Sequence, residues 1–290
     1  MPTPLSDLLR PDRLTEIVDV GASPIQSPPP YKPMLDGGLC RVTGFEPHEE
    51  ALAQLLQTKG SNERYLPFVV GNGSRHNLNI YWGSKMTSLL NVDPATLSIF
   101  LEFVPWTRLL RRVEVVTQRL DDIAEIEALD YLKIDAQGSE LAVFRSGRTK
   151  LAGAVVIQTE ISFIALYEGQ PTFGEVDVEL RKQGFIPHCF AEIKKWPISP
   201  HVVPDNPWAT SNQLLEADIV YVRDFVHPQS MSDEQLKHLA LIAHYCYQSF
   251  DLALHCVYLL EQRKVLQVGA QQAYRSCLPI GSTCENSSRE

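Results

Sequence analysis

An apolar strand pattern runs directly into two carboxylates and a glycine in the stretch Leu129-Asp130-Tyr131-Leu132-Lys133-Ile134-Asp135-Ala136-Gln137-Gly138-Ser139-Glu140. The first half predicts a buried strand, and the second half predicts a turn followed by a helix. In open α/β sheets, ligands bind outside the carboxyl ends of the strands, so polar groups at this point are candidates for chemistry. The stretch therefore predicts an α/β sheet with a ligand site at one edge.

The composition is that of an ordinary globular protein. The 290 residues are 44% hydrophobic and 21% charged, which is enough to build a full core. A net charge of −9 argues against a standing nucleic-acid partner, which would select a basic surface. The chain shows no secretory leader, no run of about 20 apolar residues and no CxxC spacing among its six cysteines. We therefore expect a cytoplasmic protein with reduced thiols and no membrane span.

Strand and helix patterns alternate from residue 16 to about residue 193. Short apolar runs predict core strands at 16–20, 41–45, 68–70, 130–134, 154–158, 185–193 and 217–222. Two further strands are predicted at 77–82 and 113–117, and helices after Pro47, from about Ser139 and from the capping box at Thr172. Alternation of this kind implies βαβ units and a doubly wound, mostly parallel sheet.

The pattern changes after Asp224. Ser232 and Gln235 form a second capping box in front of a helical pattern, and another helix is predicted from about Phe250 to Arg263. We expect three regions: a Rossmann-like domain at 1–226, a helical pair at 227–268 that offers a homo-oligomer contact, and a polar, disordered tail at 269–290.

Four predicted strands end in small or acidic residues. These ends are Asp19-Val20-Gly21, Phe45-Glu46-Pro47, Gly71-Asn72-Gly73 and Ile134-Asp135-Ala136-Gln137-Gly138. In a parallel sheet they meet at one edge, where a single nucleoside-like ligand contacts them all. Glu46 follows Gly21 by 25 positions, close to the offset of about 20 at which an acid binds a ribose diol.

The loop after Gly21 distinguishes between nucleoside ligands. It lacks the further glycines of a GxGxxG loop, which let the backbone approach a pyrophosphate. A ribose-bearing ligand without phosphates therefore fits better than a nicotinamide or flavin cofactor, and S-adenosylmethionine is such a ligand. An NAD-type oxidoreductase is the first rival function.

Taken in order, these motifs resemble those of the FkbM-type methyltransferases. Leu132 to Leu141 is similar to the family's Leu-Lys-Ile-Asp-x-[Glu/Gln]-Gly-x-Glu signature, and Thr117 to Asp121 to the Thr-x-x-Leu-Asp element before it. Val18 to Ala22 resembles the first cofactor motif, Gly44 to Pro47 the ribose-binding motif, and Met86 to Leu90 the Ser-Ser-Leu element.

The resemblance covers about residues 13 to 224. It implies a class I fold with a mostly parallel seven-stranded sheet, whose last strand, here 217–222, is antiparallel. It also implies S-adenosylmethionine as cofactor and methylation of a hydroxyl on a sugar or secondary metabolite. The residues placed at the cofactor are Asp19, Gly21, Ala22, Ser23, Glu46, Pro47, Asn72, Gly73, Ser88 and Gln137. The candidate catalytic residues are Asp135, Glu140, Glu160 and Lys133.

Structural alternatives accompany several of these residues. Asp135 either serves a ligand or caps the following helix, and Glu140 is either a general base or a first-turn carboxylate favoured by the helix dipole. Lys133 points to the opposite face from its neighbours and is expected to pair with a carboxylate such as Glu160. By residue type alone, Ser88 is more often a loop hydroxyl than a binding group.

The first loop departs from the family pattern. Pro24 and a run of three prolines at 28–30 stand where methyltransferases usually carry a second glycine, and proline fixes φ and lacks an N–H. A non-catalytic scaffold with a closed cofactor cleft is therefore the second rival function. The eight histidines form no i, i+4 pair and no ligand spacing with cysteine, so we expect no metal site.

Overall fold

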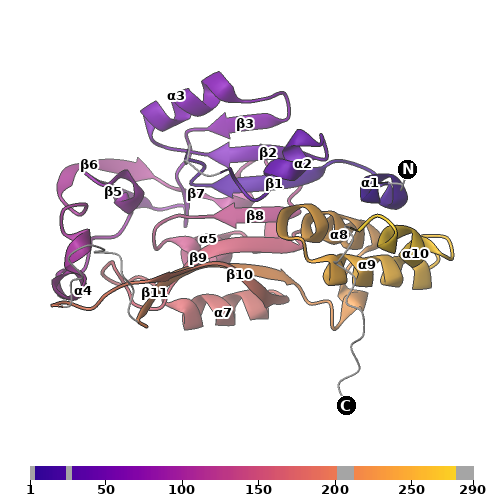
Figure 1. Ribbon diagram of the computed structural model, residues 1–290. Coiled ribbons are helices and arrows are strands. Elements are labelled where there is room, and N and C mark those ends of the chain that lie inside the picture. Colours follow the sequence, from indigo (N-terminus) through magenta and orange to yellow (C-terminus); the bar gives the residue numbers. More distant parts are fainter. Residues whose placement is uncertain (1–3, 24–27, 201–211, 279–290) are drawn as a thin grey trace, which may run out of the picture.

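The apolar runs form a seven-stranded sheet at the centre of the molecule (Figure 1). The computed structural model describes residues 4–23, 28–200 and 212–278. In spatial order the strands are β3 (Glu63–Leu66), β2 (Cys40–Phe45), β1 (Thr15–Val20), β8 (Tyr131–Ile134), β9 (Val156–Ser162), β11 (Leu214–Arg223) and β10 (Phe185–Lys195). Strands β3, β2, β1, β8 and β9 are parallel, whereas β11 is antiparallel to both neighbours. The predicted architecture, a mostly parallel seven-stranded sheet with an antiparallel last strand, is confirmed.

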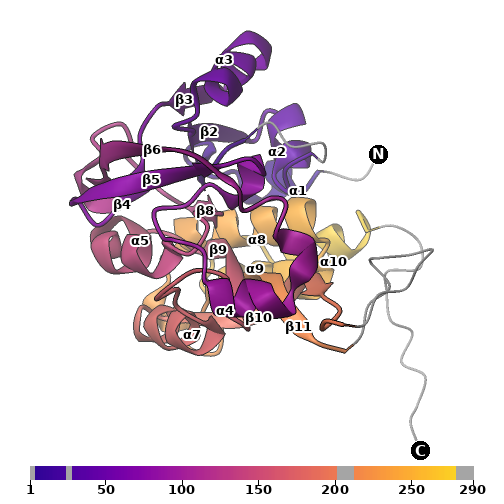
Figure 2. The ribbon, with the colours of Figure 1, turned by 90° about the vertical axis from the view of Figure 1, so that its left-hand side faces the viewer.

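Helices cover both faces of this sheet. All seven residues of β9 are buried, as expected for a strand between two layers. On one face lie α5 (Glu140–Ser146), α6 (Arg148–Leu151) and α7 (Phe173–Lys182), and on the other lie α1 (Leu5–Leu9), α2 (Lys32–Asp36), α8 (Asp233–Tyr247), α9 (Phe250–Gln262) and α10 (Ala270–Arg275) (Figures 1 and 2). Helix α3 (Glu49–Thr58) follows β2 and buries none of its residues.

The C-terminal helices cover the face of the sheet that the short connection between β1 and β2 leaves open. In its described residues, the connection from β1 to β2 contains the five-residue helix α2 and no other helix. Instead, α8 and α9 pack onto Ile17, Val42 and Val220 of the sheet in one continuous core. None of the helices in the described ranges is long and apolar enough to cross a bilayer.

The expectation of a disordered tail from residue 269 is wrong for its first part. Helix α10 buries Ala270 and Tyr274, and the Tyr274 hydroxyl lies 2.9 Å from Nδ1 of His244 on α8. The polar sequence concealed this helix because only two of its six residues contact the core. Residues 279–290 lie outside the described part of the chain.

The predicted third core strand is also wrong. Glu63–Leu66 forms the edge of the main sheet, whereas β4 (Val70–Gly71) pairs with β7 (Gln118–Arg119) in a separate small sheet. The polar edge strand carries a weak apolar pattern, and Phe68 is apolar because it stacks on Phe45 at 6.0 Å between ring centroids. Asn72 and Gly73 therefore follow the small sheet and not a strand of the main one.

Residues 72–116 form a cap at the carboxyl ends of the central strands (Figure 2). It contains β5 (Arg75–Tyr81) and β6 (Leu109–Val116), an antiparallel pair that we call the hairpin. Residues 82–108 connect the two strands and contain helix α4 (Pro94–Ile99) and 3₁₀ turns at Ser84–Met86 and Leu101–Phe103. Further 3₁₀ turns lie at Leu120–Asp122 and Pro228–Ser230. The cap has its own apolar cluster, which includes Tyr81, Phe100 and Phe103.

Replacing Leu239 of α8 by alanine tests whether the C-terminal helices share the core of the sheet. Leu239 is fully buried, so Leu239→Ala is expected to lower the free energy of unfolding by about 2–5 kcal/mol in urea denaturation. The control Val268→Ala shortens a side chain that is 96% exposed, and it is expected to change the free energy of unfolding by less than about 0.5 kcal/mol. Equal, small effects of both changes would show that the helices are not part of this core.

Candidate functional site

The loops after β1 and β8 touch at Gly21 and Asp135. Gly21 has φ +79°, and a Cβ at this position would lie 2.2 Å from the carbonyl oxygen of Asp135. Only glycine allows this approach. The Asp135 N–H donates to the Val20 carbonyl at 3.0 Å, and the N–H groups of Gly21 and Ala22 donate to the Phe45 carbonyl at 3.0 and 3.1 Å. Three of the four predicted strand ends therefore meet at one edge.

Asp19 is buried and engaged on both carboxylate oxygens. Oδ2 accepts a hydrogen bond from the Tyr31 hydroxyl at 2.7 Å, and Oδ1 accepts one from Lys133 Nζ at 2.9 Å. Burial lowers the pKa of Lys133, but the charges of Asp19, Asp135 and Asp218 and the hydrogen bond to Asp19 together raise it overall. Lys133 thus pairs with Asp19, and the expectation that it pairs with Glu160 is wrong. The two residues lie opposite each other on paired strands.

Glu46 ends β2 with one carboxylate oxygen available. Oε1 accepts the His48 N–H at 2.8 Å, and among the described residues no hydrogen bond engages Oε2. The side chain is buried, and burial raises its pKa. Pro47, half-buried beside it, leads into α3, while Ser23 is exposed on the neighbouring loop. Pro24, part of the expected departure from the family pattern, lies outside the described residues.

Gln137 connects the carboxylate of Asp135, which directly follows β8, with that of Glu160 in β9. Its Nε2 donates to Asp135 Oδ1 at 2.7 Å and to Glu160 Oε2 at 2.9 Å, while its Oε1 accepts the Tyr167 hydroxyl at 2.9 Å. The backbone of Gln137 adopts φ +47°, an unusual conformation outside glycine, and its carbonyl accepts the Ser88 hydroxyl at 2.6 Å. Every polar group of this amide side chain is therefore used to fix the site.

Glu160 is held from the other side by Lys194. Lys194 Nζ lies 2.6 Å from Glu160 Oε1 and 3.9 Å from Glu216 Oε2. Burial, followed by the charges of Asp135 and Glu216, raises the pKa of Glu160 well above its ordinary value, and Lys194 opposes this shift. The pKa of Lys194 is itself raised, because the charges of Glu160 and Glu216 outweigh its burial.

Glu140 turns back onto its own loop. Its Oε1 accepts the N–H groups of Ala136 at 2.8 Å and Gly138 at 3.3 Å, so it fixes the turn between β8 and α5. Burial raises its pKa to about 7. Asp135 does not cap the helix, because its Oδ1 bonds Gln137 and the N-cap residue, Ser139, makes no side-chain cap.

The remaining predicted cofactor residues are engaged in local bonds. Asn72 Oδ1 accepts the Ser74 N–H at 3.0 Å and lies 2.9 Å from His76 Nε2, and the Gly73 N–H donates to Thr117 Oγ1 at 3.0 Å. Asn72 and Gly73 are exposed in a turn of the small sheet. Ser88 is buried and ties the cap to the Gln137 carbonyl.

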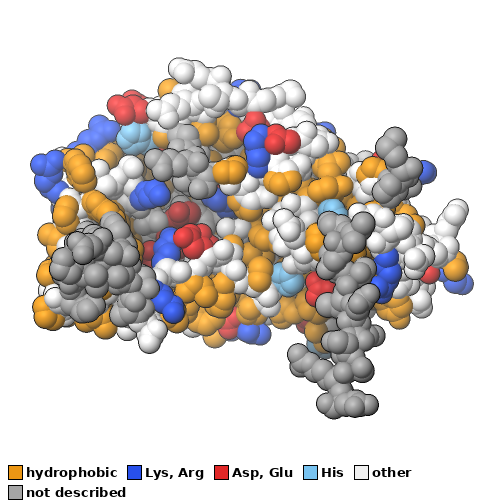
Figure 3. Space-filling model, viewed as in Figure 1, with side chains coloured by type: hydrophobic (Ala, Val, Ile, Leu, Met, Phe, Trp, Pro, Cys, Tyr) orange, Lys and Arg blue, Asp and Glu red, His pale blue; other side chains and the backbone are white. Residues whose placement is uncertain are grey.

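Acidic and basic side chains gather in a recess on the surface left of centre in Figure 3, at the end of the sheet where β1 and β8 terminate. Within the described ranges, no group of three histidine, cysteine, aspartate or glutamate side chains is arranged to hold a metal ion. The arrangement can accept hydroxyl hydrogen bonds at Glu46 and Asp135, and it places both at the edge expected for a nucleoside.

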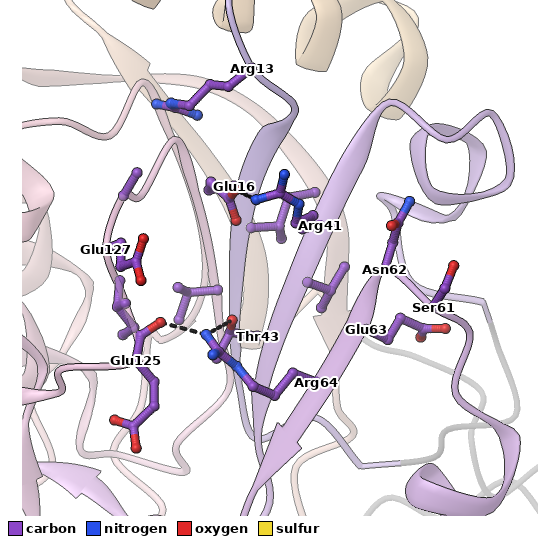
Figure 4. Close-up of a pocket in the computed structure, with 15 residues that line it drawn as sticks. Arg13, Glu16, Arg41, Thr43, Ser61, Asn62, Glu63, Arg64, Glu125 and Glu127 are labelled. Carbon is purple, nitrogen blue, oxygen red and sulfur yellow. Dashed lines mark hydrogen bonds and ion pairs between the residues drawn. The ribbon is translucent and has the colours of Figure 1, made fainter.

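A different hollow of about 360 Å³ lies on the face of β1 and β2, beside the loop that precedes β8 (Figure 4). Its arginines already have partners: Arg41 Nη1 lies 3.0 Å from Glu16 Oε1, and Arg64 Nη2 donates to Thr43 Oγ1 at 3.0 Å. Arg13 makes two contacts with the buried Asp130 carboxylate, at 2.5 and 2.9 Å. This hollow contains none of the predicted site residues.

Three site residues were missed by the sequence analysis. Tyr31 follows the proline run, Tyr167 lies in the loop after β9, and Lys194 belongs to the strand β10, far from the family motifs. Lys194 directly follows the strand predicted at 185–193, but nothing in the sequence analysis placed that strand near Glu160. Tyr31 and Tyr167 reach the site through loops, whose course the local pattern does not determine.

The raised pKa of Glu140 predicts a pH dependence of stability. A carboxyl group whose pKa is higher in the folded protein than in the unfolded chain stabilises the folded state. This contribution is complete below the unfolded pKa of 4.5 and is lost as the pH rises through the folded pKa of about 7. Glu140→Gln lacks this titration. Its free energy of unfolding, relative to wild type, is expected to increase by about 3 kcal/mol between pH 4 and pH 8 in urea titrations. The control Glu50→Gln, on the exposed first turn of α3, should leave the difference constant with pH. Parallel curves for Glu140→Gln and wild type would contradict the assignment.

Comparison with solved structures gives distant similarities. Magnesium protoporphyrin IX methyltransferase (ChlM) from Synechocystis PCC 6803, solved with bound SAM, is 9% identical with a TM-score of 0.36, over 73% of this chain and 71% of that one. Precorrin-6y C5,15-methyltransferase from Geobacter metallireducens GS-15 is 10% identical with a TM-score of 0.35, over 76% of this chain and 85% of that one. At these values the similarity carries no argument about function. Among curated proteins, none matches the sequence.

The family comparison is decisive. The model of the methyltransferase FkbM domain matches residues 19–187, which is more than half of the chain. The match begins at Asp19 in β1 and extends into β10, so it includes the edge of the sheet at which Asp19, Glu46 and Asp135 meet. The chain belongs to the FkbM methyltransferase family.

Proposed function

We propose that this protein transfers the methyl group of S-adenosylmethionine to a hydroxyl oxygen, on a sugar or a secondary metabolite. Family membership supports methyl transfer with this cofactor. The observation that carries the choice of oxygen is the Asp135 carboxylate, half-buried at the end of β8 and fixed by Gln137. A carboxylate held in this way can accept the proton of a hydroxyl group.

The residues at the ends of β1 and β2 suit the cofactor. The close contact between Gly21 and the Asp135 backbone leaves no room for a side chain there, so the loop lies flat against the end of β8. No hydrogen bond within the described residues engages Oε2 of Glu46, so it can accept hydrogen bonds from a ribose diol. We assign cofactor contacts to Gly21, Ala22, Ser23, Glu46 and Pro47. Asp19 acts as a positioning residue, since Tyr31 and Lys133 occupy both of its oxygens.

The proposed contact set is narrower than the set implied by the family motifs. Asn72, Gly73 and Ser88 use their polar atoms for bonds within the cap and its turns. Gln137 uses its whole amide to hold Asp135, Glu160 and Tyr167. We therefore assign these four residues to the positioning of the site.

The chemistry required of the protein is modest. S-adenosylmethionine, when bound, supplies a methyl group that is already activated. The chain must hold the acceptor oxygen in line with that group and remove its proton, and positioning alone supplies several kcal/mol of the barrier. We assign proton acceptance to Asp135, because no hydrogen bond within the described residues engages its Oδ2.

Glu160 is the less suitable base. Lys194 and Gln137 each donate a hydrogen bond to one of its two carboxylate oxygens. Burial also raises its pKa. Its role is to orient Gln137, and through Gln137 the carboxylate of Asp135. Glu140 is engaged by the N–H groups of Ala136 and Gly138 and supports the same turn.

Glu46→Gln tests the cofactor assignment. An amide in place of this buried carboxylate weakens its bonds to the ribose hydroxyls, so calorimetry is expected to show a loss of S-adenosylmethionine affinity of about tenfold to a hundredfold. The control Glu50→Gln lies on the exposed start of α3 and should bind like wild type. Unchanged affinity of the folded Glu46→Gln variant would remove Glu46 from the cofactor site.

Asp135→Asn tests the proton acceptor. Labelled-methyl transfer to a panel of sugars and secondary metabolites is expected to fall by at least about a hundredfold, while S-adenosylmethionine affinity stays within a few fold of wild type. Asp122→Asn makes the same substitution at an exposed aspartate and serves as the control. Equal transfer by wild type and Asp135→Asn would exclude Asp135 as the base. A wild-type chain that is folded but binds no S-adenosylmethionine would favour the scaffold function instead.

A further inference from the structure

One face of the β5–β6 hairpin packs on the protein at the end of β5, near Asn79 and Tyr81, while Arg75, Asn77 and Val116 on the same face are exposed. Residues alternate between faces along a strand, and Asn79 and Tyr81 on β5 point inward and are buried. Arg112 on β6 joins this inner face, where its Nε donates to Asn79 Oδ1 at 3.0 Å. The Asn79 N–H donates to the Ser88 carbonyl at 2.8 Å, which fixes the hairpin to the loop beside Gln137.

The opposite face carries mainly apolar side chains. Leu78 lies across from Val113 and His76 across from Val115, while Ile80 follows Leu78 on the same face. Leu78, Ile80, Val113 and Val115 are only half-buried, and none of them contributes to the three apolar clusters of the described residues. A partly exposed apolar face that joins none of the apolar clusters of the described residues is a candidate docking surface.

Two exposed apolar side chains, Trp82 and Leu110, lie at one end of the hairpin. Trp82 continues the face beyond β5 and is 56% exposed. Leu110 is the additional residue at the irregularity in the pairing between Ile80 and Tyr81, and it is 55% exposed. Trp82 and Leu110 together with Leu78, Ile80, Val113 and Val115 form what we call the hairpin face.

Charge distinguishes the hairpin from the rest of the molecule. Residues 75–82 and 108–116 contain four arginines and a single glutamate, in a chain whose net charge is −9. Arg111 lies across from Ile80, and the Trp82 N–H donates to the carbonyl of Arg108 at 2.9 Å, so two exposed cations flank the hairpin face. The glutamate, Glu114, is held by Arg75 at 2.8 Å. Basic and apolar side chains lie together at the left-hand end of the molecule in Figure 3, where Figure 1 places the hairpin.

We propose that the hairpin face docks on an anionic membrane surface. Such a surface has negative headgroups above an apolar interior, and it matches an apolar patch that carries tryptophan and is flanked by arginines. A purely apolar protein partner would not select the arginines, and a nucleic acid would not select the leucines, isoleucine and valines. The acidic remainder of the chain is repelled by the same headgroups, so the charge distribution also determines the orientation.

Vesicle co-sedimentation of the full chain tests this proposal without reference to the enzymatic reaction. The wild type is expected to bind vesicles of phosphatidylcholine with phosphatidylserine, to bind pure phosphatidylcholine vesicles much more weakly, and to dissociate as salt is added. The double variant Trp82→Ser, Leu110→Ser and the single variant Arg111→Glu are each expected to lower binding by about tenfold or more.

Matched controls use similar side chains elsewhere on the surface. Val268→Ser removes an apolar side chain that is 96% exposed, and Lys182→Glu reverses an exposed charge on α7, so both should bind like wild type. Circular dichroism checks that each variant is folded. No binding by wild type, equal binding to both vesicle types, or equal losses in the controls would overturn the proposal. So would a dimer in analytical ultracentrifugation that Trp82→Ser, Leu110→Ser dissociates, because the face would then belong to a second copy.

Discussion

The site depends on one close backbone contact, between Gly21 at the end of β1 and Asp135 at the end of β8. A Cβ at Gly21 would lie 2.2 Å from the Asp135 carbonyl oxygen, so the two loops meet only because this residue has no side chain. The N–H groups of Gly21 and Ala22 then hold the end of β2, which brings in Glu46. Beneath this contact, the buried ion pair of Asp19 and Lys133 joins the same two strands. An unpaired partner there would leave a buried charge, which is strongly destabilising.

The sequence predicted the sheet well because its central strands are apolar on both faces, and such runs are visible without any knowledge of their neighbours. It missed β3, whose polar edge residues give no apolar pattern, and it assigned a strand to Phe68, which is apolar because it stacks on Phe45. Asp19, Glu46 and Asp135 were found because each ends a strand of the sheet. The partner of Lys133 was predicted incorrectly, since the choice between Asp19 and Glu160 depends on side-chain direction.

The elements that complete the fold come from distant parts of the chain. Helices α8 to α10 cover the face that the short β1–β2 crossover leaves open, and the cap of residues 72–116 lies over the carboxyl ends of the strands. Lys194 and Tyr167 enter the site from β10 and from the loop after β9. The family motifs thus contribute the centre of the site, whereas residues outside those motifs fix the geometry of its carboxylates.

Calorimetric titration of the wild-type chain with S-adenosylmethionine and, separately, with NAD tests the central claim most directly. The edge of the sheet at Gly21 and Glu46, whose sequence lacks the glycines of a pyrophosphate-binding loop, is predicted to bind S-adenosylmethionine and not NAD. Binding of NAD alone, or of neither ligand by a chain that is folded, would contradict this account.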